Sequence, residues 1–150
     1  MGARKVLVER KLVISIRPYN PQDYEQVAAL YKQGDLYGGQ FDPDRDSPQR
    51  LKAVTEKFPE AILVAERTGK ICGTVSLIED PRTAWLFRFA APDDETTSQL
   101  FEAASLILKS CGHKQVLVHG AAGSAALDDR YASLGFTKGG DFTCFWIDDL

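Results

Sequence analysis

Several residue types that restrict function are scarce in this sequence. Three cysteines and two histidines occur among 150 residues. The cysteines are odd in number and scattered, so they form neither a disulfide framework nor a C-x-x-C metal or redox motif. There is also no basic excess, because 18 lysines and arginines face 21 aspartates and glutamates, a net charge of -3. Nucleic-acid binders usually carry a basic excess, so we expect no nucleic-acid partner.

Long apolar runs are missing as well. No stretch reaches the roughly 18 apolar residues of a membrane span. Residues 1–11 contain basic residues, but their short apolar stretch is broken by Glu9 to Lys11 and no small-residue cleavage site follows. This pattern is unlike a secretory signal. We therefore expect a cytoplasmic protein with no membrane partner.

The residues that are present are typical of one globular domain. The apolar fraction is 44% and the charged fraction 26%, which excludes disordered and fibrous classes. No repeat or long linker divides the chain. We expect residues 1–11 to form an N-terminal extension and residues 12–150 a single domain.

The first part of this domain predicts a strand and two helices. The strand is a β-branched run that stops at Arg17-Pro18, because proline cannot continue a ladder. Asn20-Pro21 and Ser47-Pro48 each supply a capping residue followed by proline, which is typical of a helix start. Between these helices, the glycines and aspartates of residues 35–46 indicate a surface loop.

The second part alternates strands and helices. Two β-branched runs are joined by Thr68-Gly69, a hairpin signal. Later helices end at Cys111-Gly112 and at Gly135. A last hairpin is expected where apolar residues flank Gly139-Gly140. The predicted strands are 13–16, 61–66, 70–78, 83–91, 116–118, 136–137 and 142–147, and the last two helices cover about 94–110 and 125–134.

Three segments within this order are distinctive: Ile16-Arg17-Pro18 followed by Asp23, the strand residues Leu86 to Ala91, and the run from Tyr131 to Gly135-Phe136. They resemble the first strand, the fourth strand and the last-helix ending of the GNAT N-acetyltransferase superfamily. The resemblance implies an α/β (α+β) fold with a mixed central sheet of about seven strands, a splay between strands 4 and 5, and about four flanking helices. It also implies transfer of acetyl from acetyl-CoA, as co-substrate, to a primary amine of a small molecule or protein.

The turn that opens the helix after the fourth strand departs from the family. Family members hold the CoA pyrophosphate on a glycine-rich turn, whereas Pro92 to Ser98 here contains three carboxylates and neither glycine nor arginine. Those carboxylates would repel phosphates. Alternatively, they cap the helix and leave the backbone N–H groups of Thr96, Thr97 and Ser98 for the ligand. Both interpretations remain open at this point.

Further cofactor contacts follow from the resemblance. The pantetheine arm is expected to pair with the backbone of Phe89, Ala90 and Ala91. Ser124 occupies the position of a family asparagine near that arm, although a helix N-cap explains this serine equally well.

Two residues are candidates for acid–base chemistry. Tyr131 aligns with the tyrosine that in many family members protonates the departing CoA thiolate, and its alternative is a packing role. His119 follows a buried strand beside the expected splay, where an imidazole can accept a proton from an amine. A structural histidine is its alternative. The family's frequent fourth-strand glutamate has no match between Thr83 and Ala91.

The acidic loop lies where the family shapes its acceptor site. Asp35 and Tyr37 would suit a cationic amine, and a solvated surface loop is the alternative. Its aspartates do not form an EF-hand, because Ser47 and Ala53 stand where the glycine and glutamate are required. We therefore expect no metal.

The sequence supports two hypotheses for the function of this protein. The first is an acetyl-CoA-dependent N-acetyltransferase. The second is a catalytically degenerate GNAT-fold binding or regulatory module, formed as a homodimer through the final strands. The turn from Pro92 to Ser98 separates them, since a fold alone does not determine function.

Overall fold

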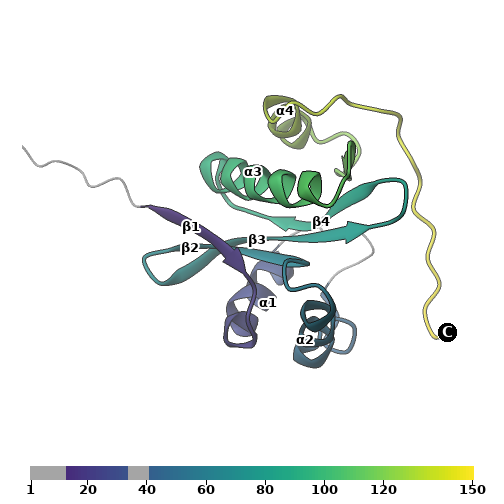
Figure 1. The fold of residues 1–150 in the computed structure, drawn as a ribbon. Coiled ribbons are helices and arrows are strands. Elements are labelled where there is room, and N and C mark those ends of the chain that lie inside the picture. The colour runs from purple at the N-terminus through teal and green to yellow at the C-terminus, as the bar shows by residue number, and fades with distance from the viewer. Residues whose placement is uncertain (1–12, 34–40) are drawn as a thin grey trace, which may run out of the picture.

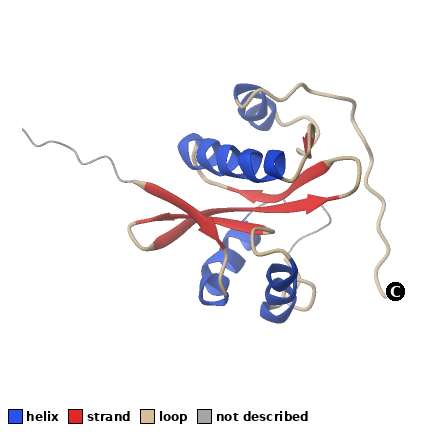
Figure 2. Ribbon diagram, in the orientation of Figure 1, coloured by secondary structure: helices blue, strands red, loops and turns tan. Residues whose placement is uncertain are grey.

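A computed structural model of the chain describes residues 13–33 and 41–150. Its strands form one mixed sheet in the order β1-β2-β3-β4-β5, with helices on both faces (Figures 1 and 2). The strands are β1 (Ile14–Pro18), β2 (Ile62–Arg67), β3 (Lys70–Glu79), β4 (Ala84–Ala90) and β5 (Val116–Val118). The helices are a short 3₁₀ turn, η1 (Pro21–Asp23), followed by α1 (Tyr24–Gln33), α2 (Pro48–Lys57), α3 (Asp94–Ser110) and α4 (Ala125–Ser133).

Both expected helix starts are confirmed. The Asn20 side chain accepts a hydrogen bond from the N–H of Gln22 at 3.0 Å, and the Asp23 carboxylate accepts one from the N–H of Asn20 at 2.9 Å. Ser47 caps α2 by accepting from the N–H of Arg50 at 3.3 Å. These bonds satisfy backbone donors that a helix start leaves without partners.

The hairpin at Thr68-Gly69 is also confirmed. These residues have φ values of 51° and 74° and join β2 to β3 in antiparallel pairing. Positive φ at both central residues is the geometry of a tight two-residue hairpin turn, in which glycine carries no steric cost. β2 and β3 pair from Ile62↔Ser76 to Arg67↔Lys70, with a register shift between Ala65 and Glu66.

β4 and β5 run parallel and are joined by α3, as the family resemblance requires. Their pairing spans Ala84↔Val116 to Leu86↔Val118 and stops there, while β4 continues to Ala90. Parallel neighbours need a long crossover, and α3 supplies it. Because β5 ends early, the last part of β4 has no hydrogen-bonded neighbour on that side among the described residues.

The two faces of the sheet bury separate clusters. On one face α3 packs Leu100, Ala104 and Leu108 against the strands. This approach is close at Gly73, where an added Cβ would lie 2.7 Å from the methyl carbon of Thr96. On the other face α1 and α2 cover a cluster of Tyr19, Val27, Tyr31, Leu51, Ile62 and Val64. Figure 1 shows these two layers of helices on either side of the sheet.

The predicted final hairpin is wrong. Residues 135–150, all of them described, form no strand, so the sheet of the described residues has five strands where about seven were expected. The apolar and aromatic residues around Gly139-Gly140 indicated a hairpin, but a strand exists only where a partner edge is engaged. Instead the segment, drawn in yellow in Figure 1, passes beside the sheet without pairing with it and leaves its large apolar side chains exposed: Phe142, Phe145, Trp146, Ile147 and Leu150.

The sequence also predicted an N-terminal extension and no membrane-spanning segment. The proposed extension, residues 1–11, lies outside the described residues. In the parts of the chain that are described, every helix is too short or too polar to cross a membrane.

Candidate active site

Helix α4 brings the two acid–base candidates to the carboxyl end of the parallel pair. Gly120 directly follows His119 at the end of β5, and an added Cβ on Gly120 would lie 3.3 Å from the ring of Tyr131. Arg130, next to Tyr131, donates to the carbonyl of Ala91 at 3.1 Å. The structure therefore places α4 against the ends of both β4 and β5, beside their point of separation.

Tyr131 occupies a largely apolar setting. Its ring meets that of Phe136 edge-on, with centroids 5.7 Å apart. Burial raises the pKa of the Tyr131 phenol, and nearby Arg130 lowers it in part. The phenol is consequently protonated at neutral pH, the state that a proton donor needs.

His119 is held between aromatic rings. It stacks on Trp85 with centroids 4.7 Å apart and meets Phe87 edge-on at 5.9 Å. Since Phe87 also lines the pocket described below, the imidazole lies beside that pocket's wall. The aromatic contacts fix the ring in place, and they serve a catalytic or a structural histidine equally well.

The turn at the start of α3 is capped by its own carboxylate. Asp93 accepts from the N–H of Thr96 at 2.8 Å, and its carbonyl accepts from the N–H of Thr97 at 3.1 Å. Thr96 and Thr97 are also buried. Of the three N–H groups considered for phosphate binding, those of Thr96 and Thr97 are therefore already engaged within the helix start, and Ser98 lies further along it.

Two arginines from other elements approach this acidic turn. Arg67, at the end of β2, lies 3.8 Å from Asp93 and 3.9 Å from Glu95. Arg130 lies 3.3 Å from Asp94. These contacts offset the negative charge that the sequence alone assigned to the turn. Although the turn itself lacks arginine, the fold supplies two.

The remaining cofactor candidates flank the separation of the strands. Phe89 and Ala90 belong to the part of β4 that extends beyond β5, and Ala91 follows them. The Ala91 carbonyl already accepts from Arg130, as noted above. Ser124 is the N-cap of α4 and accepts from the N–H of Leu127 at 3.3 Å, which is the structural role considered for it.

Within β4, Arg88 interrupts the regular strand. Its φ is 49°, and the pairing of β3 with β4 shifts register between Thr74 and Ser76. A positive φ is rare for a residue other than glycine, and here it marks a β-bulge. The bulge turns the Arg88 side chain toward α1, where the guanidinium lies 4.6 Å from the centre of the Tyr31 ring and forms an ion pair with Asp46.

This ion pair corrects the expectation for the acidic loop. Residues 35–46 were expected to be a surface loop, yet Asp46 is only 2% exposed. A buried carboxylate needs a partner, and Arg88 provides it. Asp35 and Tyr37 lie outside the described residues, so their expected role in acceptor binding stays a prediction.

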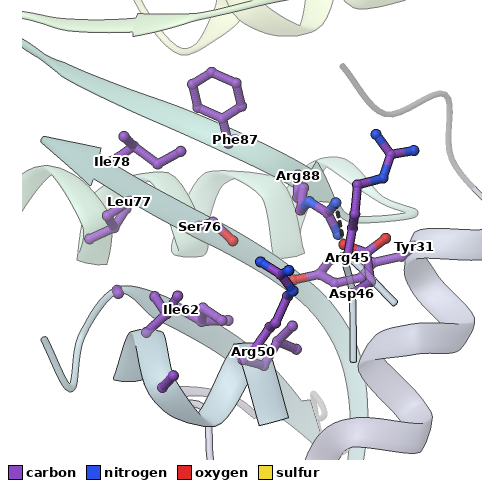
Figure 3. Close-up of a pocket in the computed structure, with 14 residues that line it drawn as sticks. Tyr31, Arg45, Asp46, Arg50, Ile62, Ser76, Leu77, Ile78, Phe87 and Arg88 are labelled. Carbon is purple, nitrogen blue, oxygen red and sulfur yellow. Dashed lines mark ion pairs between the residues drawn. The ribbon is translucent and has the colours of Figure 1, made fainter. Parts of the chain in front are cut away.

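A pocket of about 430 Å³ opens beside the bulge, between α2 and the strands β3 and β4 (Figure 3). Leu51, Val54, Ile62 and Phe87 contribute apolar walls. Its charged residues are Arg45, Asp46, Arg50 and Arg88, and its hydroxyl groups belong to Tyr31 and Ser76. This volume lies within the range of small-molecule sites.

The aspartates before α2 form a turn. The Asp42 carboxylate accepts from the N–H groups of Asp44 and Arg45, each at 2.9 Å. In the described residues, no three side chains among histidine, cysteine, aspartate and glutamate are grouped so as to hold a metal ion.

The sequence alone did not predict that these charged groups meet in one pocket. Asp46 and Arg88 are 42 positions apart, so their pairing leaves no local pattern. The signal that was present was the arginine in an otherwise apolar strand, since a charge at a buried position requires a partner. Arg50 gave no signal, because arginine on the first turns of a surface helix is ordinary.

Solved structures share this architecture. An aminoglycoside N-acetyltransferase, AAC(6′)-Iy, in complex with CoA is 18% identical, with a TM-score of 0.69 over 95% of this chain and 100% of the other. Ard1 from Thermoplasma volcanium is 19% identical, with a TM-score of 0.66 over 85% of this chain and 84% of the other. Glucosamine-6-phosphate N-acetyltransferase from Arabidopsis thaliana is 15% identical, with a TM-score of 0.66 over 91% and 99%.

No protein-family model and no curated protein sequence matches the chain. The structural likeness, together with the parallel β4–β5 pair and its crossover helix, identifies the fold as that of the GNAT N-acetyltransferases.

Proposed function

We propose that this protein is an acetyl-CoA-dependent N-acetyltransferase that acts on a primary amine. The observation that carries the proposal is the parting of β4 from β5 beyond Leu86↔Val118, next to a pocket of about 430 Å³. The edge of β4 at Phe89 and Ala90, on the side away from β3, suits the amide groups of a pantetheine arm, which can pair with backbone as an added strand does. At Ala91 the arm would compete with Arg130 for the carbonyl. The neighbouring pocket suits the acceptor.

In the proposed reaction, each candidate has one task. The acceptor amine attacks the thioester carbonyl, a C–N bond forms and the C–S bond breaks. His119 accepts the proton released by the amine nitrogen, and Tyr131 donates its phenolic proton to the departing thiolate. The raised pKa of Tyr131 keeps that proton in place until the thiolate forms.

The start of α3 supports the competing proposal, a GNAT-fold binding module. Asp93 occupies the N–H of Thr96, so fewer backbone donors remain for phosphate than at an uncapped helix start. We favour the enzyme because Arg67 and Arg130 bring positive charge to the same turn. Guanidinium groups bind phosphate oxygens through paired N–H donors.

Acetyl-CoA is therefore expected to bind, but more weakly than to a protein with an intact glycine-rich turn. At a concentration of about a hundred times its dissociation constant it should stabilise the fold by roughly 2.7 kcal/mol. For a domain of this size the melting temperature should rise by about 5–10 °C. Calorimetry and a melting scan with millimolar acetyl-CoA measure both quantities. If acetyl-CoA produces no binding heat and no shift of the melting temperature, the acetyltransferase proposal fails and the binding module remains as the function.

We also propose that the protein forms a homodimer in which residues 142–150 of one copy lie along β5 of the other. β5 is the edge of the sheet, and the segment presents Phe142, Phe145 and Trp146 with exposures of 85%, 89% and 77%. Large contiguous apolar surfaces of this kind mark interaction sites.

All three cysteines are free, which favours a cytoplasmic setting.

A further inference from the structure

Arg50 is the charged group of the pocket that has no partner in the described parts of the chain. Arg88 is paired with Asp46, and Arg45 lies 3.5 Å from Asp42 and 3.8 Å from Asp148. On α2 itself, Lys52 pairs with Glu56. The other pocket arginines are thus compensated, whereas the side chain of Arg50 makes no ion pair or hydrogen bond with described residues.

The Arg50 guanidinium points into the pocket. Figure 3 shows its side chain extending from α2 toward β3, and both Arg50 and Ser76 line the pocket. Around it are the apolar walls of Leu51 and Ile62. Arg50 is exposed to solvent, so its guanidinium is open to an anionic ligand that enters the pocket, and the hydrogen bonds between the two would be charge-assisted.

The charge of the pocket has the same sign as this group. Its lining contains three guanidinium groups and one carboxylate, Asp46, and that carboxylate is consumed by Arg88. Since Arg45 is paired with carboxylates outside the lining, the charge of Arg50 remains uncompensated, in a chain whose net charge is -3. At the rim, Arg45 already attracts a carboxylate, that of Asp148 from the C-terminal segment.

We infer that the acceptor is a small amine that also carries an anionic group, and that Arg50 binds this group. The inference rests on the proposed acetyl transfer and names the class of its acceptor. It adds an anionic group to the cationic amine that the sequence led us to expect. A planar guanidinium can bind either a carboxylate or a phosphate through two parallel hydrogen bonds, so the shared chemistry is an anionic oxygen group.

Binding of the anion is tested without acetyl-CoA. Benzoate and inorganic phosphate are titrated separately at constant ionic strength, and the side-chain N–H signals of Arg50 are followed by NMR. We expect saturable shifts with at least one anion. Arg50→Gln should weaken that binding about ten-fold or more, and Lys52→Gln, on the same helix but outside the pocket, should leave it unchanged. The inference would be overturned if neither anion gave saturable shifts, or if Arg50→Gln bound the anion as tightly as the wild type. Either result would leave the proposed acetyl transfer intact.

Acceptor choice is tested with matched pairs of amines. L-Phenylalanine is compared with phenethylamine, and glucosamine 6-phosphate with glucosamine, by measuring CoA release from acetyl-CoA. If the protein acetylates the first pair, the anionic group is a carboxylate; if it acetylates the second pair, the group is a phosphate. We expect the member that carries the carboxylate or phosphate to have the higher kcat/KM, and Arg50→Gln to raise its KM about ten- to a hundred-fold without changing the KM of the member that lacks it.

Arg50→Lys should restore part of the preference, because it keeps the charge but not the paired donors. A wild-type protein that prefers the amines without an anionic group refutes the inference alone. If no amine is acetylated although an anion binds at Arg50, the acetyltransferase proposal fails and the anion site stands.

Discussion

Replacing Tyr131 by phenylalanine is expected to lower kcat about 10²–10⁴-fold while leaving acetyl-CoA affinity nearly unchanged. The substitution removes only the hydroxyl, so the edge-on contact with Phe136 is retained. Without a donor, the thiolate must leave unprotonated or take its proton from water. Steady-state CoA release and calorimetric titration of acetyl-CoA measure the two effects.

A matched control is Tyr19→Phe. Tyr19 is also a buried tyrosine, its hydroxyl has no hydrogen-bond partner among the described residues, and it belongs to the cluster beneath α1. Its substitution should leave kcat unchanged. Equal kcat values for Tyr131→Phe and the wild type would reduce Tyr131 to a packing residue and transfer the donor role to another group.

Truncating the chain after Lys138 is expected to convert a dimer into a monomer. Burial of a large apolar side chain contributes roughly 1.5–3 kcal/mol, so the four at positions 142, 145, 146 and 147 contribute roughly 6–12 kcal/mol before the cost of association. We expect a dimer at about 100 µM protein, which requires a net free energy of association of about -5.5 kcal/mol. Sedimentation equilibrium of the full chain and of residues 1–138 measures the masses.

The full-length double variant Phe142→Ser, Trp146→Ser serves as the control for truncation. It keeps the length of the segment and removes two of its exposed apolar side chains, so it should also be monomeric. A monomeric wild-type protein at the same concentration would show that the segment does not join two copies.

The local signals of the sequence predicted most of the fold. Asn20, Ser47 and the Thr68-Gly69 turn each act within a few residues, so their caps and turn were expected correctly. The closing hairpin was not, because residues 142–147 have the apolar and aromatic composition of a strand but pair with no edge in the described structure. Composition indicates that a segment can form a strand, whereas pairing depends on elements far away in the chain.

The candidate site was less predictable for the same reason. Tyr131 and His119 were found through the family resemblance, and the structure brings them to one end of β5. The ion pair of Arg88 with Asp46 and the approach of Arg67 to the acidic turn join residues more than 20 positions apart. Electrostatic balance in a site depends on such contacts, which spacing in the sequence does not reveal.

The central claim is that acetyl passes from acetyl-CoA to an amine at the separation of β4 and β5. The most direct test is mass spectrometry of an amine panel, including glucosamine 6-phosphate and L-phenylalanine, after incubation with isotopically labelled acetyl-CoA and the full-length protein. We expect labelled acetyl on an amine nitrogen, with one CoA released per molecule of product. The Tyr131→Phe variant should form this product far more slowly. Release of labelled acetate alone, or no consumption of acetyl-CoA with any amine of the panel, would contradict the central claim.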